Sequence, residues 1–97
     1  MLQKKLMSAV SMIATHINAP YGPVVTPNDV EVSLRRGVFC AATDEANALL
    51  SALFVECSRS LIERAANELD VPMERIFMLY QDSLQMGLPE HPEWSSR

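Results

Sequence analysis

The sequence predicts a mainly α-helical fold, a small domain of three to four helices around a long central helix at about 44–69. In three segments apolar residues recur at steps of three and four, which is the spacing of one helix face. Prolines and glycines, which end helices, stand between these segments. A chain of 97 residues has room for one core, so we expect a single compact domain over 1–87 and an extended C-terminal tail over 88–97.

The first predicted helix covers about 2–18. Its apolar stripe consists of Leu2, Leu6, Val10, Ile13 and Ile17. Pro20 ends the helix, because a proline disfavours helical backbone at the residue before it. Lys4 and Lys5, followed by an apolar stretch, also fit the start of a signal peptide. Ser8 and Ser11 interrupt that stretch, so we favour the amphipathic helix.

Residues 24–42 fit two structures, and the sequence does not decide between them. Thr26 followed by Pro27 is typical of a helix start, with threonine as the N-cap and proline at the first position. Apolar and polar residues also alternate over 30–34, which is typical of a strand, and 35–37 could turn the chain into a second strand. A hairpin here would make the fold α+β.

The central helix is predicted from a cap and a dense apolar run. Thr43 can cap the N-terminus of this helix. Almost every residue between 48 and 57 is apolar, so more than one helix face needs cover. In so short a chain, this segment is either the spine of the core or the interface of a homodimer, which we favour. The core or interface candidates are Leu49, Leu50, Leu53, Phe54 and Cys57.

The last predicted helix begins at Pro72 and stops at Gly87, with a buried strand at 76–80 as the alternative. Met78 on this helix is an interface candidate, because methionine adapts to binding surfaces. Trp94 is another, because tryptophan is a preferred interface anchor. The alternative for Trp94 is that its indole packs onto the body of the same chain.

The charge balance argues against nucleic acid as a partner. The net charge is −4, and residues 29–97 hold all twelve acids. Nucleic-acid binders instead cluster lysine and arginine. No apolar run reaches the ~18 residues of a membrane span. Two cysteines are too few for a disulfide scaffold, so we expect free thiols and a cytoplasmic location.

The residues that could carry chemistry are scattered along the chain. His16, Cys40, Cys57 and His91 lie at least seventeen residues apart, without the spacing of a metal site or of a local nucleophile–base motif. We therefore expect no catalytic residue, no cofactor and no metal.

These observations favour a small cytoplasmic protein-binding module: an adaptor, chaperone-like or inhibitory regulatory protein without catalytic activity, acting through an apolar helical surface, as a homodimer. The first alternative is a helix-turn-helix transcriptional regulator using 61–86, where two predicted helices flank a tight turn at 70–72. The second is a small enzyme or ligand-binding protein. It would need a pocket that holds His16 or His91 beside a thiol or a carboxylate.

Overall fold

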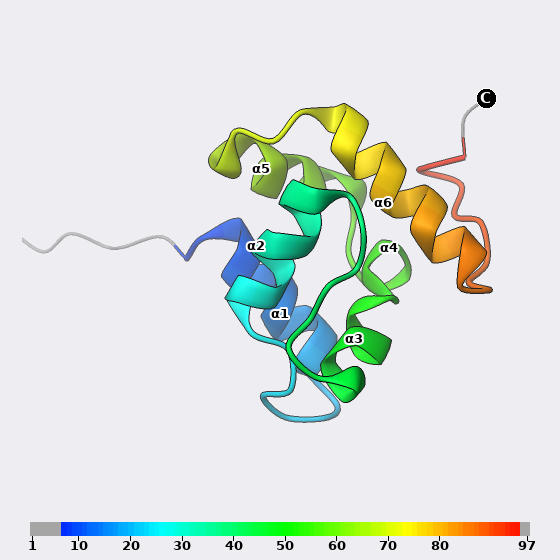
Figure 1. Ribbon diagram of the computed structural model, residues 1–97. Coiled ribbons are helices and arrows are strands. Elements are labelled where there is room, and N and C mark those ends of the chain that lie inside the picture. Colours follow the sequence, from blue (N-terminus) through cyan, green and yellow to red (C-terminus); the bar gives the residue numbers. More distant parts are fainter. Residues whose placement is uncertain (1–6, 96–97) are drawn as a thin grey trace, which may run out of the picture.

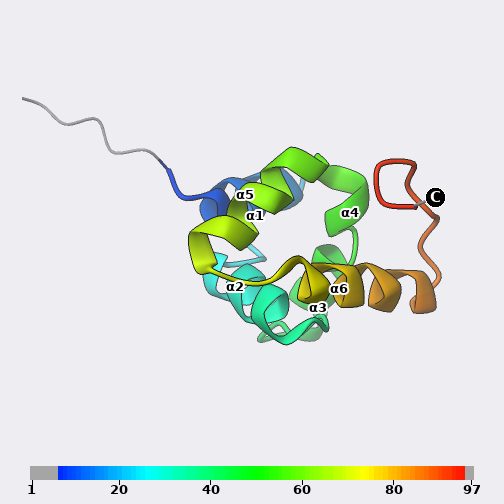
Figure 2. The ribbon, with the colours of Figure 1, turned by 90° about the horizontal axis from the view of Figure 1, so that it is seen from above.

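The computed structural model describes residues 7–95 and is mainly helical, as the sequence predicts. Six helices and no strand occur in that range. The helices are α1 (Ala9–Asn18), α2 (Pro27–Arg36), α3 (Asp44–Leu50), α4 (Leu53–Glu56), α5 (Arg59–Leu69) and α6 (Met73–Gln85). Helix α1 packs on α2 and α5, and α2 packs on α6 (Figures 1 and 2). Along the chain, the short helices α3 and α4 connect the pair α1 and α2 to the pair α5 and α6.

The predicted central helix at 44–69 is wrong as a single element, because the segment divides into α3, α4 and α5. Ser51 lies at the first break, where its hydroxyl donates to the carbonyl of Ala48 at 2.6 Å. At the second break Cys57 has an extended backbone and Ser58 caps α5. Serine competes for backbone hydrogen bonds in this way and disfavours helix interiors. The two breaks bend the apolar run around the core, and they raise the helix number from four to six.

The segment 24–42 is a helix followed by a loop, and the hairpin alternative is not supported. Thr26 and Asp29 form a reciprocal capping box at the start of α2. The backbone N–H groups of four consecutive loop residues donate to side chains instead of to a neighbouring strand. These donor–acceptor pairs are Phe39–Asp82, Cys40–Ser33, Ala41–Asn47 and Ala42–Asp29, all between 2.9 and 3.1 Å. A strand ladder would have to replace all four of these hydrogen bonds.

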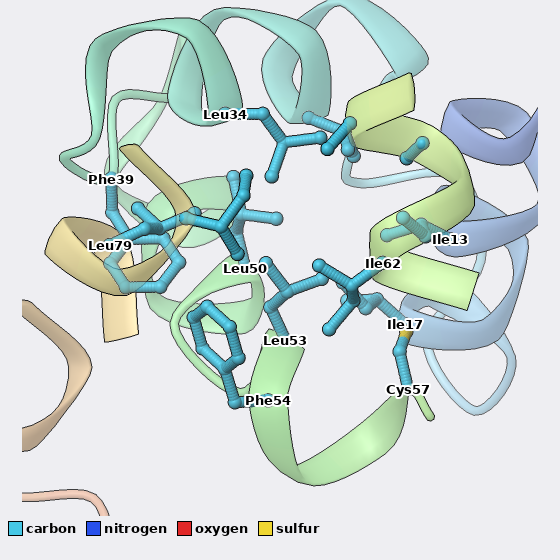
Figure 3. Close-up of a cluster of buried hydrophobic side chains, with 14 of the residues drawn as sticks. Ile13, Ile17, Leu34, Phe39, Leu50, Leu53, Phe54, Cys57, Ile62 and Leu79 are labelled. Carbon is cyan, nitrogen blue, oxygen red and sulfur yellow. The ribbon is translucent and has the colours of Figure 1, made fainter. Parts of the chain in front are cut away.

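The core forms where the helices meet (Figure 3). Its largest fully buried side chains come from every helix, and they include Ile13, Leu34, Leu50, Phe54, Ile62 and Leu79. Each of the five longest helices buries one stripe and leaves the opposite face exposed. Helix α6 also settles the alternative at 76–80, which is helical and not a strand.

Arginine and glutamate side chains tie the ends of the helices to one another. Arg75 donates to the carbonyl of Arg35 at the end of α2, and Arg35 donates to the carbonyl of Leu69 at the end of α5. At the same end of α5, Glu68 accepts a hydrogen bond from the backbone N–H of Ala9, the first residue of α1, at 2.8 Å. These contacts satisfy backbone groups that helix ends leave free.

Candidate functional site

A shallow groove runs between α6 and the loop that follows α2. It has a volume of about 270 Å³ and is lined by Gly37, Val38, Met78, Gln81, Asp82 and Gln85. Gly37 ends α2 in the left-handed conformation, with φ +74°. Its lack of a side chain lets the loop approach α6, since a Cβ there would lie 3.2 Å from the Cβ of Met78. Asp82 fixes the loop by accepting from the N–H of Phe39.

Exposed apolar side chains gather along this groove. Val38 and Met78, which face each other across it, are 42% and 48% exposed. Phe77 on α6 and Met86 at its C-cap are 41% and 45% exposed, but they do not line the groove, and Phe77 contacts Trp94 instead. Exposed large apolar side chains are usually scattered singly on soluble proteins, so two of them lining one groove, with two more nearby in the sequence of α6 and its C-cap, are informative.

The other exposed large apolar side chains are Met7, Tyr21 and Val55, on other elements of the described chain. Tyr21 borders a second hollow of about 110 Å³, whose lining is Ile17, Pro20, Tyr21, Ala48, Leu49, Ala52 and Glu56. Small-molecule sites typically have volumes of ~300–1,000 Å³, so both hollows are too small for this role. Contact with a side chain of another protein suits them better.

The structure separates the interface candidates that the sequence singles out. Leu50, Leu53, Phe54 and Cys57 are buried in the core of this chain. Leu49 is half-buried and lines the second hollow. The other helices cover the apolar segment, so it does not require a second copy of the chain. Of the set, Met78 is the residue with a largely exposed side chain.

Trp94 is 3% exposed and packs onto the body of the chain. Its ring lies edge-on to Phe54 at 4.9 Å and to Phe77 at 5.9 Å, and it stacks on Tyr80 at 6.1 Å between ring centroids. The guanidinium carbon of Arg59 lies 4.6 Å from the centroid of the Trp94 ring on its remaining side. The tail therefore fills a groove that is separate from both hollows and is formed by α4, α6 and the start of α5. We call it the aromatic groove.

The nucleophiles and bases do not come together in the described residues. Burial, with a smaller contribution from Glu56, raises the pKa of the Cys57 thiol to about 12, which leaves it protonated. Cys40 is half-buried near Arg36. Neither His16 nor His91 lines either hollow. Residues 7–95 also contain no group of three metal-ligating side chains.

Helices α5 and α6 have the outline of a helix-turn-helix, joined by three residues. Val71 N–H bonds back to the carbonyl of Ala66, with Asp70 in the left-handed conformation. The exposed surface of α6 does not suit a phosphate backbone. Arg75, its one basic residue, donates to a carbonyl of α2, and Glu74 adds negative charge.

Comparisons with protein-family models, curated proteins and solved structures find no match to this chain. Among residues 7–95, no helix is long and apolar enough to cross a bilayer.

Sequence reasoning identifies Met78 but misses Val38, Gln81 and Gln85 as parts of one surface. The available signal is the pair Phe77 and Met78, which gives α6 more apolar side chains than one buried stripe needs. The position of Val38 beside this helix depends on the close approach at Gly37, which no local pattern reveals.

Proposed function

We propose that this chain is a small cytoplasmic protein-binding module with a regulatory or adaptor role. Its binding surface is the groove between α6 and the Gly37–Val38 turn, which we call the α6 groove. The observation that carries the proposal is the pair of exposed apolar side chains, Val38 and Met78, on opposite sides of that groove. The two free cysteines support a reducing compartment.

The composition of the α6 groove resembles that of a small protein interface. Apolar side chains lie beside two amides, Gln81 and Gln85, that can donate and accept hydrogen bonds. The groove walls hold their positions in the free protein, because Gly37 contacts α6 and Asp82 holds the loop. A preformed surface loses less conformational entropy on binding.

The charge of the body indicates the chemistry of the partner. Residues 7–95 hold five arginines against twelve acids, and Glu74 and Asp82 lie on α6 itself. A partner segment that combines an apolar anchor with basic flanks is attracted by this charge. The same charge repels the phosphates of a duplex, so the helix-turn-helix alternative has weaker support.

Affinity capture from the native host, after nuclease treatment, tests this proposal. The wild-type chain and Met78→Glu are used as baits, with Tyr21→Glu as the matched control at the second hollow. Both substitutions place a carboxylate at a largely exposed position, so each is expected to leave the fold intact. We expect one protein to be recovered stoichiometrically with the wild type and Tyr21→Glu, and at least ~10-fold less of it with Met78→Glu, which corresponds to ~1.4 kcal/mol.

Equal recovery with all three baits contradicts the assignment of the surface. Loss with Tyr21→Glu alone moves the site to the second hollow. Recovery of host DNA when nuclease is omitted, with no protein partner in either preparation, supports the helix-turn-helix alternative instead.

A further inference from the structure

The C-terminal segment 88–95 is seated on the body of the chain in the manner of a bound peptide. A Schellman turn ends α6: Leu88 N–H donates to Ser83 O at 3.2 Å, and Gly87 N–H donates to Leu84 O at 3.0 Å. Gly87 has φ +93°, which reverses the chain so that the tail turns back towards α4 (Figures 1 and 2). Beyond residue 88, the backbone–backbone hydrogen bonds of the described tail are internal to it.

Side chains supply the remaining hydrogen bonds between tail and body. The N–H of His91 donates to the Tyr80 hydroxyl at 2.9 Å. Arg59 donates from Nη1 to the carbonyl of Glu93 at 2.8 Å, and its backbone N–H donates to the Glu93 carboxylate at 3.1 Å. Trp94 supplies the apolar anchor between these contacts. The aromatic groove thus holds an acidic residue followed by tryptophan, both within the turn at 92–94.

The seating of the tail in its own chain is incomplete. The indole Nε1 of Trp94 is buried and has no acceptor among the described residues. A buried donor without a partner costs about 1–3 kcal/mol. When the tail leaves the groove, the indole N–H can donate to water and this cost disappears. The tail is therefore bound less tightly than the burial of the Trp94 ring alone indicates.

We propose that the aromatic groove is a binding site for segment 88–95 of a second copy of this chain, exchanged reciprocally in a two-fold dimer. The segment seen to fit the groove is the chain's own, and a second copy offers the same segment with the same contacts. Only the conformation around Gly87 has to change for the tail to leave its own chain. Exchange of identical elements preserves the contacts and costs chiefly the entropy of association.

The two prolines of the tail support exchange. Pro89 and Pro92 fix φ at two positions of the released segment, which lowers the entropy lost when it docks again. A tethered tail has an effective concentration in the millimolar range, so a second copy competes at comparable concentrations. This proposal goes beyond the α6 groove and does not depend on its partner.

Two variants separate the groove from the tail. Trp94→Ala keeps the aromatic groove and removes the apolar anchor of the tail. It also removes the only tryptophan of the chain, so this variant has no tryptophan fluorescence and is called the dark chain. Arg59→Glu keeps the tail and places a carboxylate against Glu93, which weakens the groove. Circular dichroism establishes that each variant is helical. Tryptophan emission of the mixture then reports only the tail of the Arg59→Glu chain.

We expect Arg59→Glu alone to emit at longer wavelength than the wild type, because its indole is in water. Addition of dark Trp94→Ala up to about 1 mM is expected to shift this emission back to shorter wavelength, and sedimentation is expected to show a one-to-one heterodimer. No shift with an excess of the dark chain overturns the proposal. Wild-type emission from Arg59→Glu alone also overturns it, because Arg59 then does not hold the tail.

Sedimentation of the wild type over the same concentration range provides a test that needs neither of these variants to fold. A dimer that forms near 1 mM is expected. A wild type that stays monomeric throughout overturns the proposal. If Trp94→Ala folds, it is expected to remain monomeric, and a dimer of equal affinity from this variant also overturns the proposal.

Discussion

Gly37 is the residue on which the shape of the α6 groove depends most, and Gly37→Ala tests that dependence. The left-handed backbone at φ +74° costs an L-residue about 1–2 kcal/mol. A Cβ would also lie 3.2 Å from the Met78 Cβ and 3.3 Å from the carbonyl oxygen of Arg75. Overpacking of this kind costs about 1–3 kcal/mol, so we expect a total loss of about 2–5 kcal/mol in the free energy of unfolding.

Gly22→Ala is the matched control. Gly22 has φ +86°, but a Cβ there meets nothing within 4 Å. We expect this variant to lose about 1–2 kcal/mol at most, from the backbone conformation alone. Each alanine also removes the same conformational entropy from the unfolded chain. This contribution cancels when the losses in the free energy of unfolding of the two variants are compared.

Urea denaturation followed by circular dichroism measures both losses. The account predicts that Gly37→Ala loses at least ~1 kcal/mol more than Gly22→Ala, which is the contact contribution. Equal losses would mean that a Cβ at position 37 meets no obstacle, and therefore that α6 does not approach the end of α2 closely.

Three further predictions concern residues outside the α6 groove. Asp70, at φ +58°, holds the left-handed position after α5, so Asp70→Gly should stabilise the fold by about 0.5–1 kcal/mol in urea, whereas Asp70→Ala should not. The pKa of Glu68 is lowered, chiefly by the hydrogen bond from the Ala9 N–H and next by Arg64, so its contribution to stability is present at neutral pH and is lost as the carboxylate protonates. Wild type and Glu68→Gln should therefore differ in urea midpoint at pH 7, and the difference should shrink as the pH falls below the ordinary glutamate pKa of about 4.3; a difference that stays constant in acid would disprove this role. Ellman's reagent should label Cys40 and spare Cys57 until the chain is unfolded, with Cys57→Ala identifying the slow thiol; rapid labelling of both would show that Cys57 is accessible.

Local backbone chemistry was predictable from the sequence. Thr43 caps α3 as predicted, and the break before α6 falls at 70–72. Thr26 caps α2, which confirms one of the two structures that the sequence left open for 24–42. These features depend on hydrogen bonds and backbone angles within a few residues, so a short window of sequence contains the necessary information.

The division of the 44–69 segment was not predictable from apolar spacing. Leu50, Leu53 and Phe54 are compatible with a helix interior, and they remain helical on either side of the break at Ser51. The break is favoured because it directs all three side chains into one core. That preference arises from tertiary packing, which outweighs local propensity.

The candidate surfaces were predictable only as single residues. Met78 and Trp94 stand out by residue type, but their neighbours Val38 and Phe54 come from distant parts of the chain. Whether an apolar residue is covered or exposed depends on these neighbours. Sequence alone therefore gave the same prediction for Met78, which is exposed, as for Phe54, which is buried.

Site-specific photocrosslinking in the native host shows whether the α6 groove binds another protein. A photoreactive residue replaces Met78 in the α6 groove, and a second chain carries it at Tyr21 as the control. We expect one discrete protein adduct from position 78 and none from position 21. An adduct from position 21 alone, or adducts with nucleic acid from position 78, would contradict this expectation.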